Sequence, residues 1–164
     1  MFAGLRYELI EGDLIDKMGQ KPPHSLGLRL ASFALIAKYG VRNVRVQQPM
    51  EVAGPDRTWS FPEPDLVVAI DDGRFNNRNP QGDETVQVVE VADTTLRHDG
   101  ATKRDLYARA NVPEYWVLDV KGRQLLVYEQ PIAGAYTIRR TLSETDSIHD
   151  MPVADMLPPK EPKE

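Results

Sequence analysis

The sequence contains no cysteine among its 164 residues. This absence excludes disulfide bonds, thiolate metal sites and a cysteine nucleophile. It is compatible with a reducing cytoplasm. No apolar run approaches the roughly 20 residues that a helix needs to span a bilayer. The first residues also lack the basic and apolar regions of a secretory signal. We therefore expect a cytoplasmic protein that is not inserted in a membrane.

An excess of positive charge is also missing. The 20 lysines and arginines are outnumbered by 25 aspartates and glutamates, which gives a net charge of −5. Non-specific binding to nucleic acid depends on cationic side chains that neutralise phosphates. The composition therefore argues against generic tight DNA binding. It leaves room for a local basic patch, or for a bound divalent cation that supplies positive charge at one site.

The length fits one domain, whose core is large enough to fold without disulfides or structural metals. No internal repeat or low-complexity linker divides the chain. We expect residues 1–150 to form a single domain. Residues 151–164 are rich in Pro and Lys, and we expect them to form a mobile tail.

Hydrophobic spacing gives the order of the elements. Two short runs around Gly12 and Asp13 predict a hairpin over residues 7–18. After the break at Pro22 and Pro23, helical spacing predicts a helix over residues 25–39, which Gly40 ends. A second helix is expected from Asp99, as N-cap, to about residue 110. The predicted strands cover residues 41–52, 66–70, 85–92, 114–120, 124–129 and 136–139.

This order predicts an α/β fold of the mixed α+β kind. A helix between two strands allows those strands to be parallel, whereas hairpin connections demand antiparallel pairs. The sequence therefore predicts a central mixed β-sheet flanked by helices.

Glu90 is the most informative polar residue. It lies within the apolar strand predicted over residues 85–92, on the same face as Val86 and Val88. A carboxylate buried there is unfavourable unless it is paired or binds a metal. Asp65 opens the neighbouring apolar run after Pro64, so the two acids together can form a two-carboxylate site. Mg²⁺ is commonly held by one or two carboxylates, with waters and substrate phosphate.

Two basic side chains are candidates for the same site. Lys103 lies early in the helix that follows the Glu90 strand, where its ammonium can position water or stabilise charge on phosphate. His24, near the start of the first helix, is a candidate for orienting water or contacting phosphate.

Each of these residues also has a structural interpretation. Asp65 alone fits a turn cap, and Lys103 alone fits a solvated lysine paired with Asp99. Glu90 can be a structural acid satisfied by a core Arg or Lys, and His24 a helix-start residue with a satisfied hydrogen bond. The occurrence of Asp65, Glu90 and Lys103 in this order favours the functional interpretation.

The same residues resemble a known family. Pro64 and Asp65, followed by Glu90 in an apolar strand, resemble the PD-(D/E)xK nuclease superfamily. The chain is more closely similar to its Uma2 group of restriction-endonuclease-like proteins over about residues 7–128. The segments that carry this resemblance are 7–12 with His24, 64–68, 88–95, Asp99 with Lys103 and Tyr107, and 112–119.

The resemblance implies a restriction-endonuclease-like core that uses Mg²⁺ or Mn²⁺. It implies that Asp65 and Glu90 are metal ligands, with the Val91 carbonyl as a third. The superfamily pattern places a lysine two residues after the glutamate, where this chain has Ala92. By the same resemblance, Lys103 on the following helix replaces that lysine.

The leading hypothesis is a Mg²⁺-dependent endonuclease that hydrolyses phosphodiester bonds in DNA, with Asp65, Glu90, Lys103 and His24 in its site. Analogy at the level of the fold predicts a homodimer, because cutting a duplex needs two sites. A second hypothesis is a catalytically inactive module that keeps the nuclease fold and acts through a protein partner. A third is a structural or toxin-like protein that binds a partner through an apolar strand edge.

Overall fold

The centre of the protein is a six-stranded mixed β-sheet, seen in a computed structural model that describes residues 7–17, 21–92 and 98–162. The strands of this sheet follow the order β3-β4-β5-β6-β7-β8, in which β5 and β6 are parallel and all other neighbours are antiparallel. The predicted mixed sheet is therefore confirmed. The elements are β1 (Tyr7–Ile10), β2 (Asp13–Asp16), α1 (Pro22–Tyr39), η1 (Val41–Asn43), β3 (Val44–Val46), α2 (Asp56–Trp59), β4 (Leu66–Val68), η2 (Gly82–Glu84), β5 (Gln87–Ala92), α3 (His98–Arg109), β6 (Glu114–Asp119), β7 (Gln124–Ile132), β8 (Ala135–Ser143), β9 (Ser147–Ile148), β10 (Met151–Pro152) and η3 (Val153–Met156).

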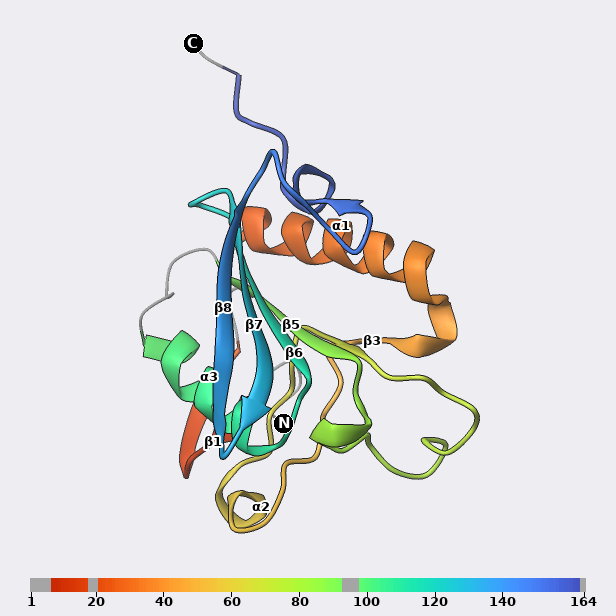
Figure 1. The fold of residues 1–164 in the computed structure, drawn as a ribbon, viewed down its shortest axis with the longest axis vertical. Coiled ribbons are helices and arrows are strands. Elements are labelled where there is room, and N and C mark those ends of the chain that lie inside the picture. Colours follow the sequence, from red (N-terminus) through yellow and green to blue (C-terminus); the bar gives the residue numbers. More distant parts are fainter. Residues whose placement is uncertain (1–6, 18–20, 93–97, 163–164) are drawn as a thin grey trace, which may run out of the picture.

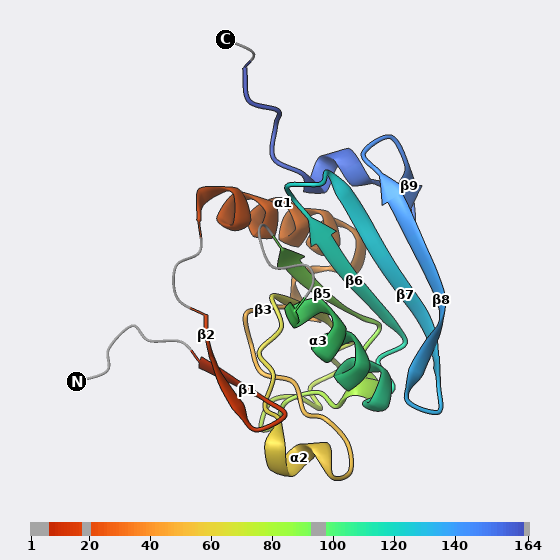
Figure 2. The same ribbon diagram turned by 90° about the vertical axis from the view of Figure 1, so that its left-hand side faces the viewer.

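The two long helices cover opposite faces of the sheet (Figure 1). One hydrophobic core lies beneath α1 and η3, and a second lies beneath α3, with the β1–β2 hairpin at its side (Figure 2). Strand β5 contributes to both cores, because successive side chains of a strand point to opposite faces. Val89 and Val91 face α1, whereas Val88 faces α3. Glu90 shares the face of Val88 and therefore lies on the α3 side.

The start of α1 differs from the prediction. The helix begins at Pro22, so the two prolines expected to break the chain instead form its first turn. Proline is tolerated there because the first N–H groups of a helix have no partner within it. Gly40, with φ of 88°, ends α1 as predicted. Neither α1 nor any other helix in the described part of the chain has the length and apolar character needed to cross a bilayer.

The strand predicted over residues 41–52 is much shorter in the structure. Only Val44–Val46 is extended in the sheet, because Gln47 adopts a left-handed backbone with φ of 49°. Met50 and Val52 are still buried, but their segment bonds to loops: Met50 N–H donates to the Pro62 carbonyl. Alternating apolar residues here therefore reflect burial without a strand ladder.

The end of the domain also differs from the prediction. Residues 151–157, expected to belong to a mobile tail, instead form β10 and η3 and pack against α1. Met151, Val153, Met156 and Leu157 are buried members of the first core. Their apolar side chains outweigh the Pro and Lys content of the segment, so the folded unit extends beyond residue 150.

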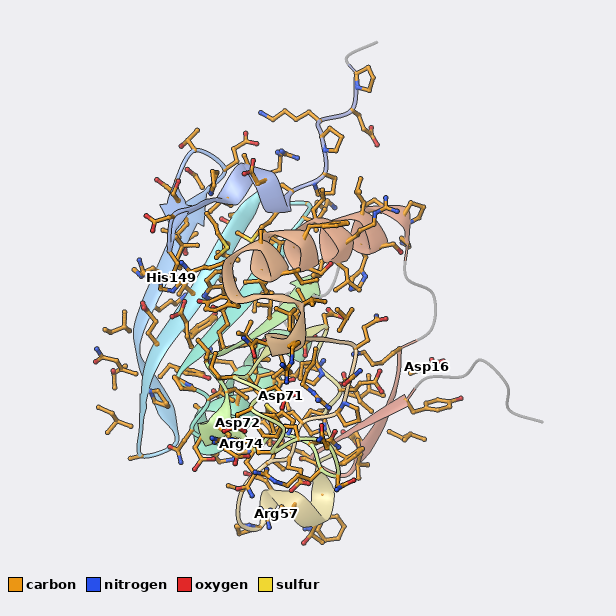
Figure 3. The ribbon with its side chains drawn as sticks, turned by 90° about the vertical axis from the view of Figure 1, so that its right-hand side faces the viewer. Asp16, Arg57, Asp71, Asp72, Arg74 and His149 are labelled. Atoms are coloured by element: carbon orange, nitrogen blue, oxygen red, sulfur yellow. The ribbon has the colours of Figure 1, made fainter. Side chains whose placement is uncertain are left out.

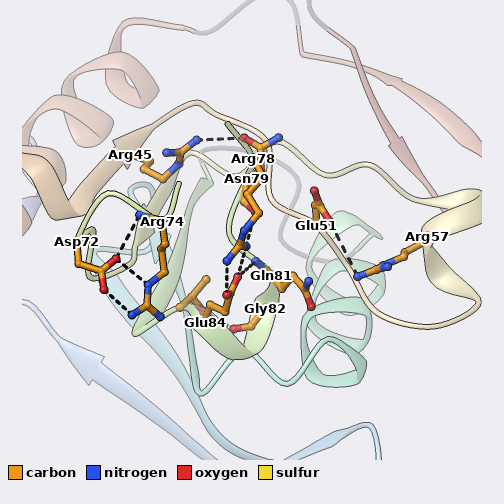
Figure 4. A network of polar contacts seen from close by, with 11 residues as sticks. Arg45, Glu51, Arg57, Asp72, Arg74, Arg78, Asn79, Gln81, Gly82 and Glu84 are labelled. Carbon is orange, nitrogen blue, oxygen red and sulfur yellow. Dashed lines mark hydrogen bonds and ion pairs between the residues drawn. The ribbon is translucent and has the colours of Figure 1, made fainter. Parts of the chain in front are cut away.

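The long loop between β4 and β5 is held by local ion pairs and by its approach to α3. Arg78 forms a bidentate pair with Glu84, and Arg74 pairs with Asp72 (Figure 4). Next to this network, η2 comes very close to the C-terminal end of α3. A Cβ atom placed on Gly82 would lie 2.2 Å from the Ala110 carbonyl oxygen.

We expect Gly82→Ala to destabilise the protein by about 1–3 kcal/mol, because the added methyl group forces the loop away from α3. Gly100→Ala is the matched control, since a Cβ atom at Gly100 meets nothing within 4 Å. Urea unfolding of both variants measures the difference. Equal stability of the two variants would show that the loop moves without cost.

Candidate active site

The two acids predicted to act together lie opposite each other on neighbouring strands. In the antiparallel pair of β4 and β5, Leu66 faces Val89. Continuing this register by one residue places Asp65 opposite Glu90, on the face that α3 covers. Directly opposed residues of an antiparallel pair have Cβ atoms about 4.5–5.5 Å apart. Both carboxylates are buried, with 3 % of Asp65 and 8 % of Glu90 exposed.

Glu90 is bound by two side chains of α3. Lys103 Nζ lies 3.0 Å from Glu90 Oε1, and the Tyr107 hydroxyl donates a hydrogen bond of 2.8 Å to the same oxygen. Lys103 and Tyr107 are four residues apart, which places them on one face of the helix. The buried Lys103 is thus not the solvated lysine of the structural interpretation. The contact between Glu90 and Lys103 also matches the structural interpretation of Glu90, in which a core Arg or Lys satisfies the acid.

Asp65 is held from two sides. The backbone N–H of Val91 donates a hydrogen bond of 2.8 Å to Asp65 Oδ2, and His24 Nε2 lies 3.4 Å from the same oxygen. His24 comes from the first turn of α1, and Val91 comes from β5. The structure therefore brings together all the predicted site residues: His24 with Asp65, and Lys103 with Glu90.

The β1–β2 hairpin adds a third carboxylate. Glu8 Oε1 lies 2.5 Å from Lys103 Nζ, and Glu8 Oε2 accepts the N–H of Glu63 at 3.1 Å. Lys17, just after β2, lies 3.9 Å from Glu8 Oε2. The Lys103 ammonium is consequently shared between Glu8 and Glu90, which are distant in sequence.

The charges of the site shift its pKa values in opposite directions. Burial alone would raise the pKa of Asp65, but the hydrogen bond from His24 and the charge of Lys17 outweigh it and lower the pKa to about 2. Burial raises the pKa of Glu90; the Lys103 charge opposes this rise, and the Asp65 charge adds to it. Burial acts to lower the pKa of Lys103, but the carboxylates of Glu90 and Glu8 raise it above its usual value. Lys103 is therefore an ammonium at neutral pH.

Among the described residues, each of the two facing acids has one carboxylate oxygen that accepts no hydrogen bond. Both contacts of Glu90 converge on Oε1, and both contacts of Asp65 converge on Oδ2. Within residues 7–17, 21–92 and 98–162, Glu90 Oε2 and Asp65 Oδ1 accept no hydrogen bond. Such oxygens suit a hard divalent cation, which takes one or two carboxylates and completes its shell with water and phosphate. The described residues contain no cluster of three or more His or acidic side chains arranged to enclose a metal. The residues therefore fit a Mg²⁺-type ion bound by few protein ligands, but not an all-protein cage.

Sequence reasoning gave little weight to three participants. Nothing local in the β1 sequence indicates that Glu8 reaches α3. Lys17 carried no signal. Tyr107 looks like an apolar helix residue in the sequence, although its spacing from Lys103 places both side chains on one face. The motif residues 93–95 and the side chain of Asp99 lie outside the described part of the structure.

His149, the other histidine whose side chain is described, lies elsewhere. His149 stacks on Trp116, with ring centroids 6.0 Å apart, and its Nε2 lies 2.9 Å from Glu114 Oε1. It is on the opposite side of the molecule from Asp16 of the hairpin (Figure 3). His149 therefore takes no part in the acidic site.

The model of the Uma2 family, described as "Putative restriction endonuclease", matches residues 1–156, which include every residue of this site. The chain belongs to the Uma2 family. Among solved structures, it is similar to one described as a "putative nuclease belonging to DUF820" from Anabaena variabilis. That similarity has a TM-score of 0.67 with 16% sequence identity, and it covers 92% of this chain and 88% of the other. No curated protein matches the chain. Membership of Uma2 and the shared fold agree with the predicted restriction-endonuclease-like core.

Proposed function

We propose that this domain is a metal-dependent endonuclease that hydrolyses phosphodiester bonds in DNA. The observation that carries the proposal is the pair Asp65 and Glu90. The two acids face each other on adjacent strands next to the buried ammonium of Lys103, and each has one oxygen that accepts no hydrogen bond from the described residues. Membership of a restriction-endonuclease family supports the same conclusion.

In this proposal Asp65 and Glu90 hold Mg²⁺ or Mn²⁺. Val91 is the third ligand through its carbonyl, because the N–H and C=O of a residue in an extended strand point to the same side. The Val91 N–H already points to Asp65. A bound ion of this kind lowers the pKa of water and offsets charge on a phosphate.

The protein's own residues have separate roles. Lys103 contributes a fixed positive charge, which stabilises the negative charge that develops on the phosphate. Because Glu8 also binds Lys103, the ammonium keeps a partner when Glu90 is engaged elsewhere. His24 holds Asp65 in place through Oδ2 and is positioned to orient water beside it. Tyr107 orients Glu90 by donating to Oε1.

A cleavage assay tests the proposal. Supercoiled plasmid and single-stranded DNA are incubated with the protein and Mg²⁺ or Mn²⁺, with and without EDTA. We expect nicking that requires the metal and is lost in Asp65→Asn. Asp72→Asn is the matched control, because Asp72 is an exposed acid paired with Arg74. Nicking that persists in EDTA or in Asp65→Asn would refute the metal site.

The inactive module remains the second candidate, because Lys103 already neutralises part of the acidic charge and Ala92 occupies the usual lysine position. Absence of both nicking and calorimetric metal binding would favour this module and a protein partner. The homodimer and the cytoplasmic location stay predictions; sedimentation analysis tests the former.

A further inference from the structure

A second feature lies on the same face of the sheet as the acidic site. A hollow of about 500 Å³ opens between the first turns of α3 and strands β6, β7 and β8. Val117 and Leu126 line its apolar part, and Arg104, Arg139 and Thr141 line its polar part. Pockets of a few hundred cubic ångströms with an apolar surface and a few polar groups are typical of ligand sites.

The two arginines are held by an aromatic ring. The guanidinium groups of Arg104 and Arg139 lie 5.9 Å and 5.7 Å from the centroid of the buried Tyr128 ring. Cation–π contacts of this kind orient a guanidinium without neutralising its charge. The pocket therefore holds two oriented cations in a chain whose net charge is −5.

The pairing of these arginines leaves positive charge in the hollow. Arg104 donates a hydrogen bond of 2.8 Å from its Nε atom to Asp105 Oδ1. Arg139 forms no ion pair with any residue in the described ranges. The adjacent Arg140 points to the other face of β8 and is paired with Glu129 at 2.8 Å. Arg139 is thus the cation most available to an anionic ligand.

The strand register connects the hollow to the acidic site. Glu90 is opposite Val117, Val117 is opposite Leu126, and Leu126 is opposite Thr141. With strands about 4.8 Å apart, this row extends roughly 14 Å from Glu90 to Thr141. Helix α3 contributes to both places, because Lys103 contacts Glu90 whereas the neighbouring Arg104 lines the hollow.

We infer that this hollow binds the phosphodiester backbone of the DNA strand, a few nucleotides from the cleaved bond. The inference rests on the nuclease function proposed above and names how its substrate is held. Guanidinium groups match phosphate oxygens in bidentate geometry. Val117 and Leu126 offer apolar contact to the sugar. Positive charge concentrated here lets an acidic protein bind a polyanion.

Binding of fluorescently labelled single-stranded DNA in EDTA tests the inference, with anisotropy measured over a series of salt concentrations. We expect Arg139→Gln to weaken binding about tenfold at low salt. The slope of log affinity against log salt is expected to fall by about 0.7–1. Arg139→Lys keeps the charge and should retain most of the slope. Arg140→Gln is the matched control and should bind as the wild type does, and thermal unfolding of each variant checks its fold.

Equal DNA binding by the wild type and Arg139→Gln would overturn the inference. Equal losses of binding in Arg139→Gln and Arg140→Gln would do the same, as would the absence of binding by the wild type at low salt. Competition by inorganic phosphate distinguishes a free anion from a strand. If inorganic phosphate displaces the labelled DNA as effectively as unlabelled DNA does, the hollow binds a free anion, and the inference that it binds a DNA strand is overturned. Because the assay excludes metal and cleavage, the hollow can be supported even if the nuclease proposal fails.

Discussion

Replacing Glu90 by glutamine is expected to lower metal-dependent DNA cleavage about a thousandfold, the upper end of what one preorganised charged contact contributes. Glutamine keeps the length of the side chain and an oxygen that Lys103 and Tyr107 can bind. It replaces Oε2, the proposed metal-binding oxygen, with an amide nitrogen, which cannot bind a cation. Initial rates of plasmid nicking and calorimetric titration with Mn²⁺ measure the two effects, and both should be lost together.

The fold of the Glu90→Gln variant should survive. Removing one partner of a buried ion pair commonly costs about 3–5 kcal/mol when the other charge is left alone. Lys103 is not left alone, because Glu8 remains 2.5 Å from its ammonium. Glu129→Gln is the matched control, since that acid pairs with Arg140 on strands remote from the site. Cleavage within tenfold of the wild type in Glu90→Gln would exclude Glu90 as a metal ligand.

The parts of the fold that the sequence predicted well are those with strong local signals. The hairpin at Gly12, the C-terminal end of α1 at Gly40 and the buried strands β4 and β5 follow from turn residues and apolar runs. Where local and tertiary signals conflict, the tertiary contacts decide. The left-handed Gln47 ends β3 early, and Met50 is buried by contacts with loops that no periodicity reveals.

The site was predictable to the extent that its residues are anomalous in their own segments. Glu90 is a charge in an apolar strand, and Asp65 opens the strand beside it, so local pattern identifies both. Glu8 lies in an ordinary half-exposed hairpin, and its contact with Lys103 depends on how that hairpin packs against α3. A long-range contact of this kind has no signature within the hairpin sequence, so the structure is needed to find it.

Replacing Lys103 by methionine is expected to lower cleavage about a hundredfold to a thousandfold, the loss typical of one preorganised charge at a developing anion. It should also change the pH dependence of metal binding. Lys103 opposes the rise that burial and Asp65 cause in the pKa of Glu90. Without Lys103 the pKa of Glu90 rises further, so Mn²⁺ binding should fail at a higher pH on acidification. Asp65, with a pKa of about 2, stays ionised throughout this range.

The free energy of unfolding gives an independent measurement of how the Lys103 charge affects the ionisation of Glu90. In Lys103→Met the folded protein keeps a proton on Glu90 at pH values where the unfolded chain has released it. Stability should therefore fall as the pH rises between the ordinary Glu pKa of about 4.3 and the raised folded value. Urea unfolding across this range measures the slope. Lys103→Arg preserves the charge and should keep the acidic limit of metal binding near that of the wild type. A methionine variant with unchanged pH dependence would mean that Lys103 does not control the ionisation of Glu90, and the ammonium would then have no part in tuning the metal ligand.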